Sequence, residues 1–356
     1  MMGSKLNKSF WKDKNVFLTG HTGFKGSWLS LWLYKLGANV TGYSHPAPTS
    51  PSLFEIARIE ELLTNSFIGD INNYKFLCES IQKAKPEIII HMAAQPLVRK
   101  SYDDPIETYQ TNVMGTVHIM EAARTCSSLK AILNVTTDKC YENKEWEWGY
   151  REYESLGGRD PYSNSKACSE LVTASYRDSF LSTLDIKVAT ARAGNVIGGG
   201  DWAEDRLIPD LLKSLTNQKE IQIRNPHAIR PWQHVLEPLK GYLLLCENLV
   251  LNGKDYAQAW NFGPLDSEIK NVKWIVEHML EKWPKKNYGY SILTQDIKLE
   301  ASILKLDSSK ATKKIGWEPN WSLDETLDSI IEWEVKYQEN KDMRTVCEEQ
   351  IAKYEL

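Results

Sequence analysis

The chain has 356 residues, of which 42% are hydrophobic and 25% are charged, and its formal net charge at pH 7 is -4. This length allows one large or two medium domains with a substantial core, and the mildly acidic balance gives no reason to expect nucleic-acid binding. The longest apolar stretches, such as residues 88–90 and 243–245, are far too short to cross a bilayer, and the polar N-terminus lacks the apolar centre of a signal peptide. A cytoplasmic protein is expected.

Cysteine and histidine usage argues against disulfides and metals. The six cysteines and seven histidines are scattered, with no C-x-x-C pair and no cluster at metal-ligand spacing. We therefore expect free thiols in a reducing compartment and no metal site. The 13 tryptophans are more typical of core packing than of base stacking, given the acidic balance.

Short β runs alternate with helical patterns over the first 135 residues. In chain order we expect a strand at 15–18, a helix at 27–36, a strand at 39–43, a helix at 53–63, a strand at 65–69, a helix at 72–84, a strand at 87–91, a helix at 113–124 and a strand at 131–135. The all-apolar centre of the strand at 87–91 is typical of a strand buried on both faces. Repeated strand–helix–strand units with short links predict an α/β fold with a Rossmann-like, doubly wound parallel sheet.

The regular alternation fades after Gly194. A helix at 236–249 and a strand at 260–262 return the chain to the sheet, and helices at 323–340 and 344–353 end it. We therefore assign residues 1–193 and 236–262 to the dinucleotide-binding domain. Residues 194–235 and 263–356 form a smaller, mixed α/β domain, which we assign to the substrate.

The stretch T-G-H-T-G-F-K-G at residues 19–26 lies between the first strand and the first helix. The first glycine, Gly20, permits a tight turn, Gly23 lets the backbone approach a pyrophosphate, and Gly26 lets helix and strand pack closely. The free N–H groups of the helix N-terminus then favour an anion. This context predicts dinucleotide binding by the whole loop, Phe24 included.

Two residues of this loop are unusually bulky. His21 and Lys25 stand where small or apolar residues are common. Three arrangements are open: they crowd the pyrophosphate, Lys25 adds a charge contact to it, or both side chains point to solvent.

The second strand lacks the acid that normally holds the adenosine ribose of NAD, since the sequence there reads Tyr43, Ser44, His45. The absence of an arginine for a 2′-phosphate leaves a mild bias toward NAD. We expect NAD to bind more weakly than in related proteins. Asp70 and Ile71, after the third strand, are candidates for the adenine edge.

Tyr162 and Lys166 lie four residues apart in D-P-Y-S-N-S-K-A, on one face of a helix. A lysine ammonium beside a phenol favours the phenolate, so Tyr162 could take a proton from a hydroxyl. Thr137 follows the strand at 131–135 and is expected to face the same crevice.

The glycine loop, the strand-end threonine and Y-x-x-x-K, in this order, resemble the short-chain dehydrogenase/reductase superfamily. The chain length, H-M-A-A-Q at 91–95 and T-N-V-M-G-T at 111–116 look like its extended branch, which acts on nucleotide sugars. The resemblance covers about residues 14–335 and implies NAD as cofactor. It also implies that Ala93, Ala94 and Gln95 line the nicotinamide side and that Asn112 is a scaffold residue.

The stretch V-T-T-D-K-C-Y at 135–141 indicates the reaction. Sugar-nucleotide 4,6-dehydratases carry Thr-Asp-Glu here, and this chain has Thr137, Asp138 and Lys139. With G-H-T-G-F-K-G and R-P-W-Q-H-V at 230–235, the pattern is similar to that of the CDP-glucose 4,6-dehydratases. The resemblance implies oxidation of CDP-D-glucose at C4, loss of water across C5 and C6 and hydride return to C6.

In that reaction Tyr162 takes the proton of the 4-hydroxyl and Asp138 protonates the departing 6-hydroxyl. Lys139 has two open direct roles, and a salt bridge with Asp138 without such a role is the alternative to both. As C5 base it must be neutral, which a shared proton with Asp138 in a dry site would favour, because lowering a lysine pKa of ~10.4 by about three units costs roughly 4 kcal/mol. As a protonated group it would stabilise the enolate.

The resemblance also implies a set of substrate residues after the Y-x-x-x-K helix and near the 91–95 segment. They are Arg99, Asn195, Arg206, Leu207, Arg230 and Asn261, with Gln95 as a second candidate beside Arg99 for the sugar. The nucleobase rests on resemblance alone, so a dTDP-, UDP- or GDP-hexose dehydratase, a sugar-nucleotide 4-epimerase and a non-catalytic dinucleotide sensor remain alternatives. By family analogy the helices at 113–124 and 162–180 pack against a second subunit in a homodimer or homotetramer.

Overall fold

The computed structural model describes residues 4–223, 225–284, 289–292 and 303–356. Its centre is a seven-stranded sheet with the order β11-β6-β5-β4-β1-β2-β3, and every neighbouring pair is parallel. The strands are β1 (Asn15–Thr19), β2 (Asn39–Ser44), β3 (Asn65–Ile68), β4 (Ile88–His91), β5 (Ala131–Val135), β6 (Lys187–Ala193) and β11 (Ala259–Phe262). The predicted doubly wound parallel sheet is confirmed.

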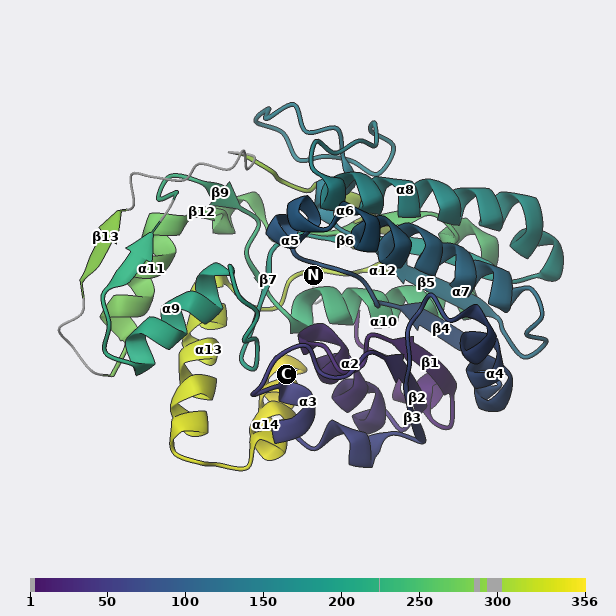
Figure 1. The fold of residues 1–356 in the computed structure, drawn as a ribbon, viewed down its shortest axis with the longest axis horizontal. Coiled ribbons are helices and arrows are strands. Elements are labelled where there is room, and N and C mark those ends of the chain that lie inside the picture. Colours follow the sequence, from purple (N-terminus) through teal and green to yellow (C-terminus); the bar gives the residue numbers. More distant parts are fainter. Residues whose placement is uncertain (1–3, 224, 285–288, 293–302) are drawn as a thin grey trace.

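Helices cover both faces of this sheet (Figure 1). They are α1 (Lys8–Trp11), α2 (Phe24–Lys35), α3 (Leu53–Ile56), α4 (Tyr74–Ala84), α5 (Val98–Asp103), α6 (Pro105–Tyr109), α7 (Gly115–Ala123), α8 (Pro161–Tyr176), α9 (Leu207–Thr216), α10 (Leu236–Leu251), α11 (Val272–Lys282), α12 (Ser309–Ile315), α13 (Leu323–Gln338) and α14 (Met343–Tyr354). The short strands outside the sheet are β7 (Val196–Ile197), β8 (Ile221–Ile223), β9 (Ile229–Arg230), β10 (Gln233–His234), β12 (Lys270–Asn271) and β13 (Tyr290–Ile292).

Successive residues of the central strands are buried on opposite faces. Ile88 and Ile90 of β4 join the cluster that contains α2 and α10, whereas Ile89 joins the cluster that contains α4 and α7. All three side chains are fully buried. This is the pattern that a parallel strand covered by helices on both sides requires.

A second, smaller core lies beside the sheet. It is built from α9, β8, α11 and the first part of α13. The C-terminal helices α12 and α14 lie elsewhere, because Ala311, Ile315, Val346 and Ile351 belong to the core of the central sheet. The assignment of 263–356 to the second domain therefore needs correction, since two of its helices complete the first.

Two predicted helices differ in detail. The helix expected at 53–63 is broken at Arg58, which has a left-handed backbone (φ 51°), and continues as a 3₁₀ turn. The break is held from far along the chain, because Arg344 of α14 donates to the carbonyls of Ala57 and Arg58. The helix expected at 113–124 starts earlier, with α6 running into α7 through a π-helical turn at Gln110–Met114.

None of the helices in the described part of the chain combines the length and apolar character that crossing a membrane requires.

Candidate active site

The glycine loop between β1 and α2 is tightly packed where the sequence predicts it. Gly20 has a positive φ of 79°, and a Cβ there would lie 2.9 Å from the backbone nitrogen of Ala93. A Cβ on Gly26 would lie 2.0 Å from the carbonyl oxygen of Gly20. Gly23 is the N-cap of α2 and makes no side-chain cap, and the first turn holds no acidic residue. The open helix N-terminus therefore fits a pyrophosphate.

His21 and Lys25 both turn inward, so the arrangement with both in solvent is wrong. The His21 ring is fully buried against Gly42, and its Nε2 lies 2.9 Å from Ser66 Oγ. Lys25 Nζ donates to the hydroxyl of Tyr242 on α10 at 3.2 Å. Burial, with the charges of Lys166 and Arg206, lowers the pKa of Lys25 to about 7.

The segment after β4 is fixed by the residues around it. Thr19 Oγ1 accepts hydrogen bonds from the backbone of Met92 and Ala93. Asn112, in the π-helical turn, pairs with the backbone N–H and carbonyl of Gln95, which supports its predicted scaffold role. The Gln95 side-chain amide donates to Leu97 and Thr108 and is therefore committed to this loop, which leaves Ala94 and the backbone for the predicted cofactor contact.

The far end of the predicted cofactor site has no carboxylate after β2. The last residue of β2 is Ser44, and its hydroxyl lies 2.9 Å from Thr22 Oγ1. Asp70 is half exposed and accepts a hydrogen bond from the backbone of Asn72, and Ile71 is buried in the core. Their proposed contact with the adenine stays a prediction.

A short turn after β5 brings the predicted catalytic residues together. Thr137 Oγ1 donates to Asp138 Oδ1 at 3.0 Å, and Lys139 Nζ donates to the same oxygen at 3.3 Å. Lys139 Nζ also lies 3.4 Å from Asn195 Oδ1. Asp138 is 0% exposed, and its second oxygen, Oδ2, has no hydrogen-bond partner among the described residues. A buried, half-satisfied carboxyl is suited to bind a substrate hydroxyl.

Burial acts on the pKa values of both Tyr162 and Lys166. Burial raises the pKa of Tyr162 to about 12, although a hydrogen bond with Thr137 lowers it. The Lys166 ammonium donates to the carbonyl of Val135 at 3.2 Å, and burial lowers its pKa to about 8 against the opposing charge of Glu170. Burial disfavours the charged form of each group, and the stabilisation of a Tyr162 phenolate by Lys166 stays a prediction.

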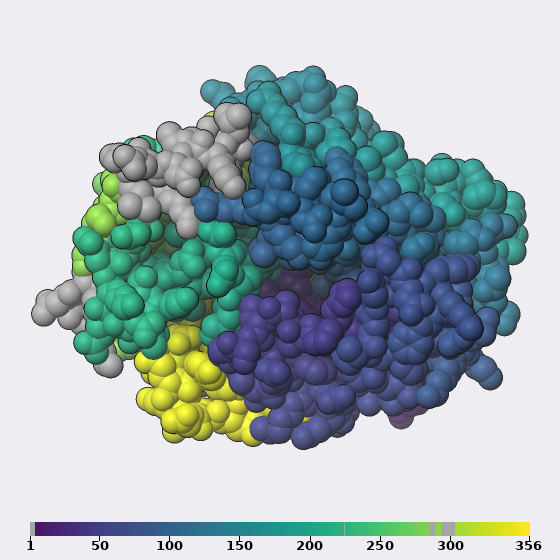
Figure 2. All heavy atoms as spheres, in the orientation of Figure 1, coloured from purple at the N-terminus to yellow at the C-terminus, as the bar shows by residue number. Residues whose placement is uncertain are grey.

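Of the predicted substrate residues, Asn195 contacts this turn, through Lys139. Arg206, directly before Leu207 and α9, pairs with Asp201 at 2.9 Å, and its charge acts on Tyr162 and Lys25. Arg99 of α5 pairs with Asp205 at 3.3 Å. Figure 2 shows a hollow on this face between the blue atoms of the α5–α6 region and the purple atoms of the N-terminal part of the chain, with the green α9 region beside it.

Two further predicted substrate residues, Arg230 and Asn261, are buried and bonded within the protein. Arg230 is buried and donates to the carbonyl of Ile229. Asn261 is 0% exposed, and its side chain bonds Tyr141, the carbonyl of Tyr150 and the carbonyl of Asp307. The assignment of Asn261 to the substrate is therefore corrected to a structural role.

Sequence reasoning missed three residues near the turn. Glu170 and Arg192 form a buried, two-pronged ion pair, and Tyr242 holds Lys25. The spacing of Tyr162, Lys166 and Glu170 at four-residue steps was a signal for Glu170. No local pattern indicated Arg192 or Tyr242, because each meets its partner only in the fold.

Known proteins are similar to this chain in sequence and in fold. The sequence profile described as GDP-mannose 4,6 dehydratase matches residues 17–330. The chain belongs to this family. A curated CDP-glucose 4,6-dehydratase from Salmonella typhimurium is 52% identical over 354 residues, which are 98% of this chain and 98% of that protein. The resemblance to the sugar-nucleotide 4,6-dehydratases is confirmed.

Solved structures agree on the fold. The dTDP-glucose 4,6-dehydratase from Bacillus anthracis, in complex with NAD, has a TM-score of 0.74 at 21% identity and covers 93% of this chain and 99% of its own. The UDP-glucuronic acid 4-epimerase from Bacillus cereus, in complex with UDP-glucuronic acid and NAD, has a TM-score of 0.79 at 23% identity and covers 90% and 99%. Both support the Rossmann-like architecture.

Proposed function

We propose that the protein is an NAD-dependent CDP-D-glucose 4,6-dehydratase, a lyase that forms CDP-4-dehydro-6-deoxy-D-glucose and water. The observation that carries this proposal is the 52% identity, over 98% of the chain, to a curated enzyme of that activity. The clustering of Thr137, Asp138 and Lys139 with Tyr162 supplies the groups that such a reaction needs.

The residues present fit NAD. The open N-terminus of α2 and the close backbone approach at Gly20 and Gly26 would hold its pyrophosphate, and residues 93–95 would line the nicotinamide side. When bound there, NAD would supply the hydride acceptor for oxidation at C4 and, once reduced, the hydride donor for C6. The lack of an acid after β2, together with the inward His21 and Lys25, supports the prediction that it binds weakly; a nanomolar dissociation constant would contradict this.

Side chains of this protein would carry out the proton transfers of the reaction. Tyr162 Oη, as the phenolate and beside the hydroxyl of Thr137, takes the proton of the sugar 4-hydroxyl. The ketone at C4 acidifies the hydrogen at C5. Asp138 Oδ2, which is buried and without a partner in the described chain, lies ready to protonate the departing 6-hydroxyl.

Lys139 fits two roles in the elimination. Its contact with Asp138 at 3.3 Å allows one proton to be shared, which gives the neutral amine that a C5 base needs. The same position suits an ammonium that stabilises the enolate. Lys139→Arg separates the two, because arginine keeps the charge and cannot act as the base.

The assay that tests the function compares CDP-, dTDP-, UDP- and GDP-activated hexoses with added NAD and scores products by mass. Loss of one water from CDP-glucose alone is expected. Loss of water from a dTDP-, UDP- or GDP-hexose instead would make that nucleotide sugar the substrate. A product of unchanged mass would indicate a 4-epimerase. Binding of NAD without turnover of any of the four would favour a dinucleotide sensor.

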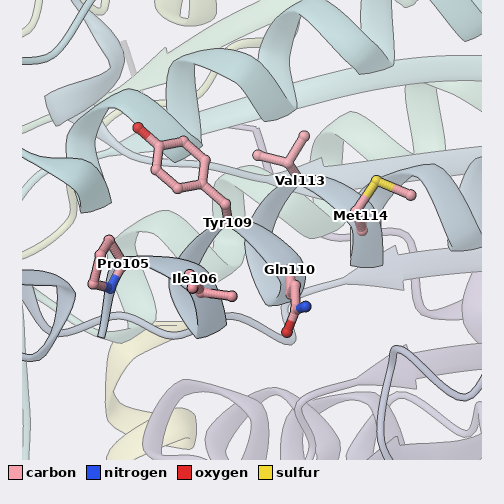
Figure 3. Close-up of a pocket in the computed structure, with 6 residues that line it drawn as sticks. All are labelled: Pro105, Ile106, Tyr109, Gln110, Val113 and Met114. Carbon is pink, nitrogen blue, oxygen red and sulfur yellow. The ribbon is translucent and has the colours of Figure 1, made fainter. Parts of the chain in front are cut away.

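We also propose that the protein is a homo-oligomer. An apolar depression of about 410 Å³ lies on α6 and the π-helical turn that follows it. Figure 3 shows the residues that line it: Pro105, Ile106, Tyr109, Gln110, Val113 and Met114. Ile106 is 70% exposed and Met114 44% exposed, which is unusual for such side chains on a monomer. The neighbouring helix α8, which packs on α6 and α7, carries a further exposed apolar side chain, Leu171. Val113, Met114 and Leu171 lie within the segments 113–124 and 162–180, which the family analogy assigns to the subunit contact, and α6 directly precedes the first of them.

A charge at the centre of this face tests the assembly. Ile106→Asp is expected to shift the protein to a smaller mass in light scattering, without loss of helical signal. Leu251→Asp is the control, because Leu251 is 60% exposed at the end of α10, away from this face. Equal masses for both variants and the wild type would contradict the proposed interface.

We further infer a cytoplasmic location. All six cysteines are free thiols, three of them buried, which is typical of a reducing compartment. Fractionation of cells that express the protein would place it.

A further inference from the structure

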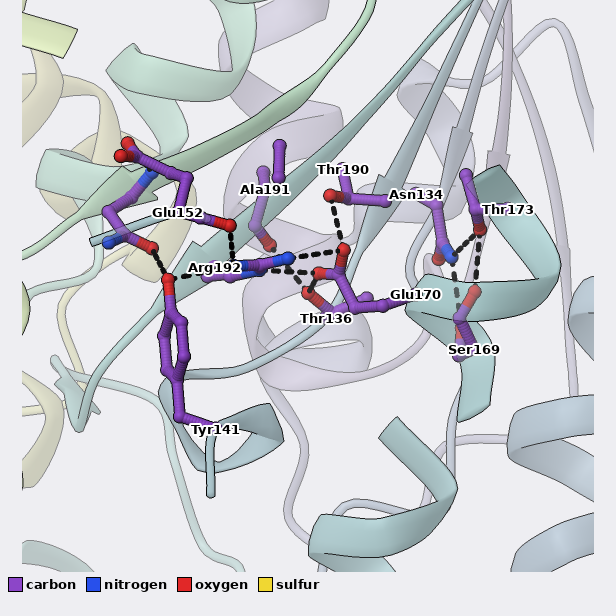
Figure 4. Close-up of polar contacts among 12 residues, drawn as sticks. Asn134, Thr136, Tyr141, Glu152, Ser169, Glu170, Thr173, Thr190, Ala191 and Arg192 are labelled. Carbon is purple, nitrogen blue, oxygen red and sulfur yellow. Dashed lines mark hydrogen bonds and ion pairs between the residues drawn. The ribbon is translucent and has the colours of Figure 1, made fainter. Parts of the chain in front are cut away.

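The catalytic turn is tied at both ends to one buried ion pair. The residue before it, Thr136, donates its hydroxyl hydrogen bond to Glu170 of α8. The residue that closes it, Tyr141, accepts a hydrogen bond from Arg192 of β6 at 2.8 Å. Glu170 and Arg192 are joined by two parallel bonds of 2.9 Å each, as Figure 4 shows. The segment that contains Thr137, Asp138 and Lys139 is thus bracketed by a single pair.

This pair is well suited to hold a fixed position. Both side chains are almost fully buried, and Thr190 adds a fourth hydrogen bond to the Glu170 carboxylate, at 2.7 Å, beside those from Thr136 and Arg192. Although burial raises the pKa of Glu170, Arg192 and the two threonine hydroxyls outweigh it and hold that pKa below the usual range. The planar guanidinium fixes direction as well as distance.

The pair also connects the turn to the helix that carries Tyr162. Tyr162, Lys166 and Glu170 follow one another at four-residue steps along α8. The carboxylate that holds the catalytic turn therefore lies on the same helix as Tyr162, the proton acceptor. Beyond Tyr141 the network continues to Asn261 at 2.7 Å, which anchors it to β11.

We propose that Glu170, Arg192 and Tyr141 are positioning residues for the elimination step: they hold the Asp138–Lys139 turn at a fixed place relative to Tyr162. The proposal rests on the proposed dehydratase function. Oxidation at C4 uses Tyr162 on the rigid helix, whereas elimination uses Asp138 and Lys139 on the turn. Loosening the turn therefore slows the second step more than the first.

Tyr141→Phe tests this with the smallest change, because it removes one hydroxyl and keeps the ring. Tyr150→Phe is the matched control: its ring stacks on Tyr141 at 5.0 Å, but its hydroxyl bonds Asn143 and Lys144 rather than the ion pair. Thr136→Val removes the anchor at the other end and serves if Tyr141→Phe does not fold. Thermal unfolding confirms that each variant is folded.

The readout is the absorbance of reduced nicotinamide during turnover of CDP-glucose by the NAD-loaded enzyme. Tyr141→Phe and Thr136→Val are expected to lower kcat by roughly tenfold or more, with KM nearly unchanged, and to accumulate reduced cofactor, since misplacement of a catalytic group by about 1 Å can cost that much. Tyr150→Phe is expected to behave as the wild type.

A loss of kcat in Tyr141→Phe without reduced cofactor, or equal accumulation in Tyr150→Phe, would overturn the proposal. So would wild-type kinetics in Tyr141→Phe. A wild-type enzyme that releases no water from CDP-glucose would instead overturn the proposed function, and the wild-type trace shows this before any variant is compared.

Discussion

Two glycines of the dinucleotide loop, Gly23 and Gly26, are expected to respond differently to replacement by alanine: Gly23→Ala weakens NAD binding, and Gly26→Ala lowers the stability of the fold. A Cβ on Gly26 would lie 2.0 Å from the carbonyl oxygen of Gly20, whereas a Cβ on Gly23 would meet the same oxygen at 3.4 Å, an ordinary contact. Gly23 has a φ of -78°, which alanine adopts without strain. The first substitution thus disturbs packing, and the second only adds a methyl group to the anion cradle.

The magnitudes follow from what must move. In Gly26→Ala the start of α2 must shift by more than 1 Å from β1, and Trp28 and Leu29 on that helix are fully buried. Overpacking of this kind costs about 1–3 kcal/mol of the free energy of unfolding. In Gly23→Ala the lost N-cap preference and the reduced freedom of the unfolded chain are each a few tenths of a kcal/mol to about 1 kcal/mol and oppose each other, so stability changes little.

Urea denaturation and calorimetric titration with NAD separate the two effects. Gly23→Ala is expected to unfold with the wild-type midpoint and to bind NAD at least about tenfold more weakly, or about 1.4 kcal/mol. Gly26→Ala is expected to lose stability. The assignment of roles would be refuted if Gly26→Ala were as stable as the wild type, or if Gly23→Ala bound NAD normally.

Three further measurements probe the site and its surroundings. Asp138→Asn is expected to lower kcat about 10²–10⁴-fold in the mass-based assay while leaving CDP binding intact, because the amide cannot protonate the 6-hydroxyl; near-normal turnover would exclude Asp138 as the acid. Arg206→Ala is expected to raise the KM for CDP-glucose about tenfold or more through loss of a charged hydrogen bond, and an unchanged KM would remove it from the substrate site. Stability is expected to fall by at least about 1 kcal/mol per pH unit between pH 6.5 and 5, because three histidines are held neutral by burial with pKa values well below 6.5 and the unfolded chain gains protons there. These histidines are His21, His91 and His234, with pKa values of about 4, 3 and 3. Glu237, whose pKa burial raises to about 7, offsets part of this fall, and urea midpoints that do not change between pH 7 and 5 would contradict it.

The sheet was predictable because its signals are local. Strands such as β1, β4 and β5 are short apolar runs between turn residues, and the structure places them within a residue of the expected bounds. Strand β6 gave a weaker signal, since its sequence K-V-A-T-A-R-A is rich in alanine rather than in β-branched residues. Its position was fixed by pairing with β5 and β11, which no local pattern encodes.

The candidate catalytic residues could be named from the sequence because their spacing is short. Thr137, Asp138 and Lys139 are consecutive, and Tyr162 and Lys166 share one helix face. The role of Asn261 was misjudged, since only the fold shows that its amide is consumed by Tyr141 and two carbonyls. The direction of Lys25 likewise depends on a tyrosine 217 residues away.

The docking of α14 on α2 has a consequence for how the chain acquires its structure. Trp32 of α2 donates to Glu355 at 3.0 Å and meets the ring of Tyr354 edge-on. Tyr354 in turn donates to Glu237 of α10 at 2.6 Å. A ribosome delivers α2 long before it delivers the helix that covers it, so the indole surface of α2 stays uncovered through most of synthesis. This half of the sheet is therefore made early but receives its last covering helix only when the C-terminus is complete, and for that interval its apolar surface is exposed to aggregation.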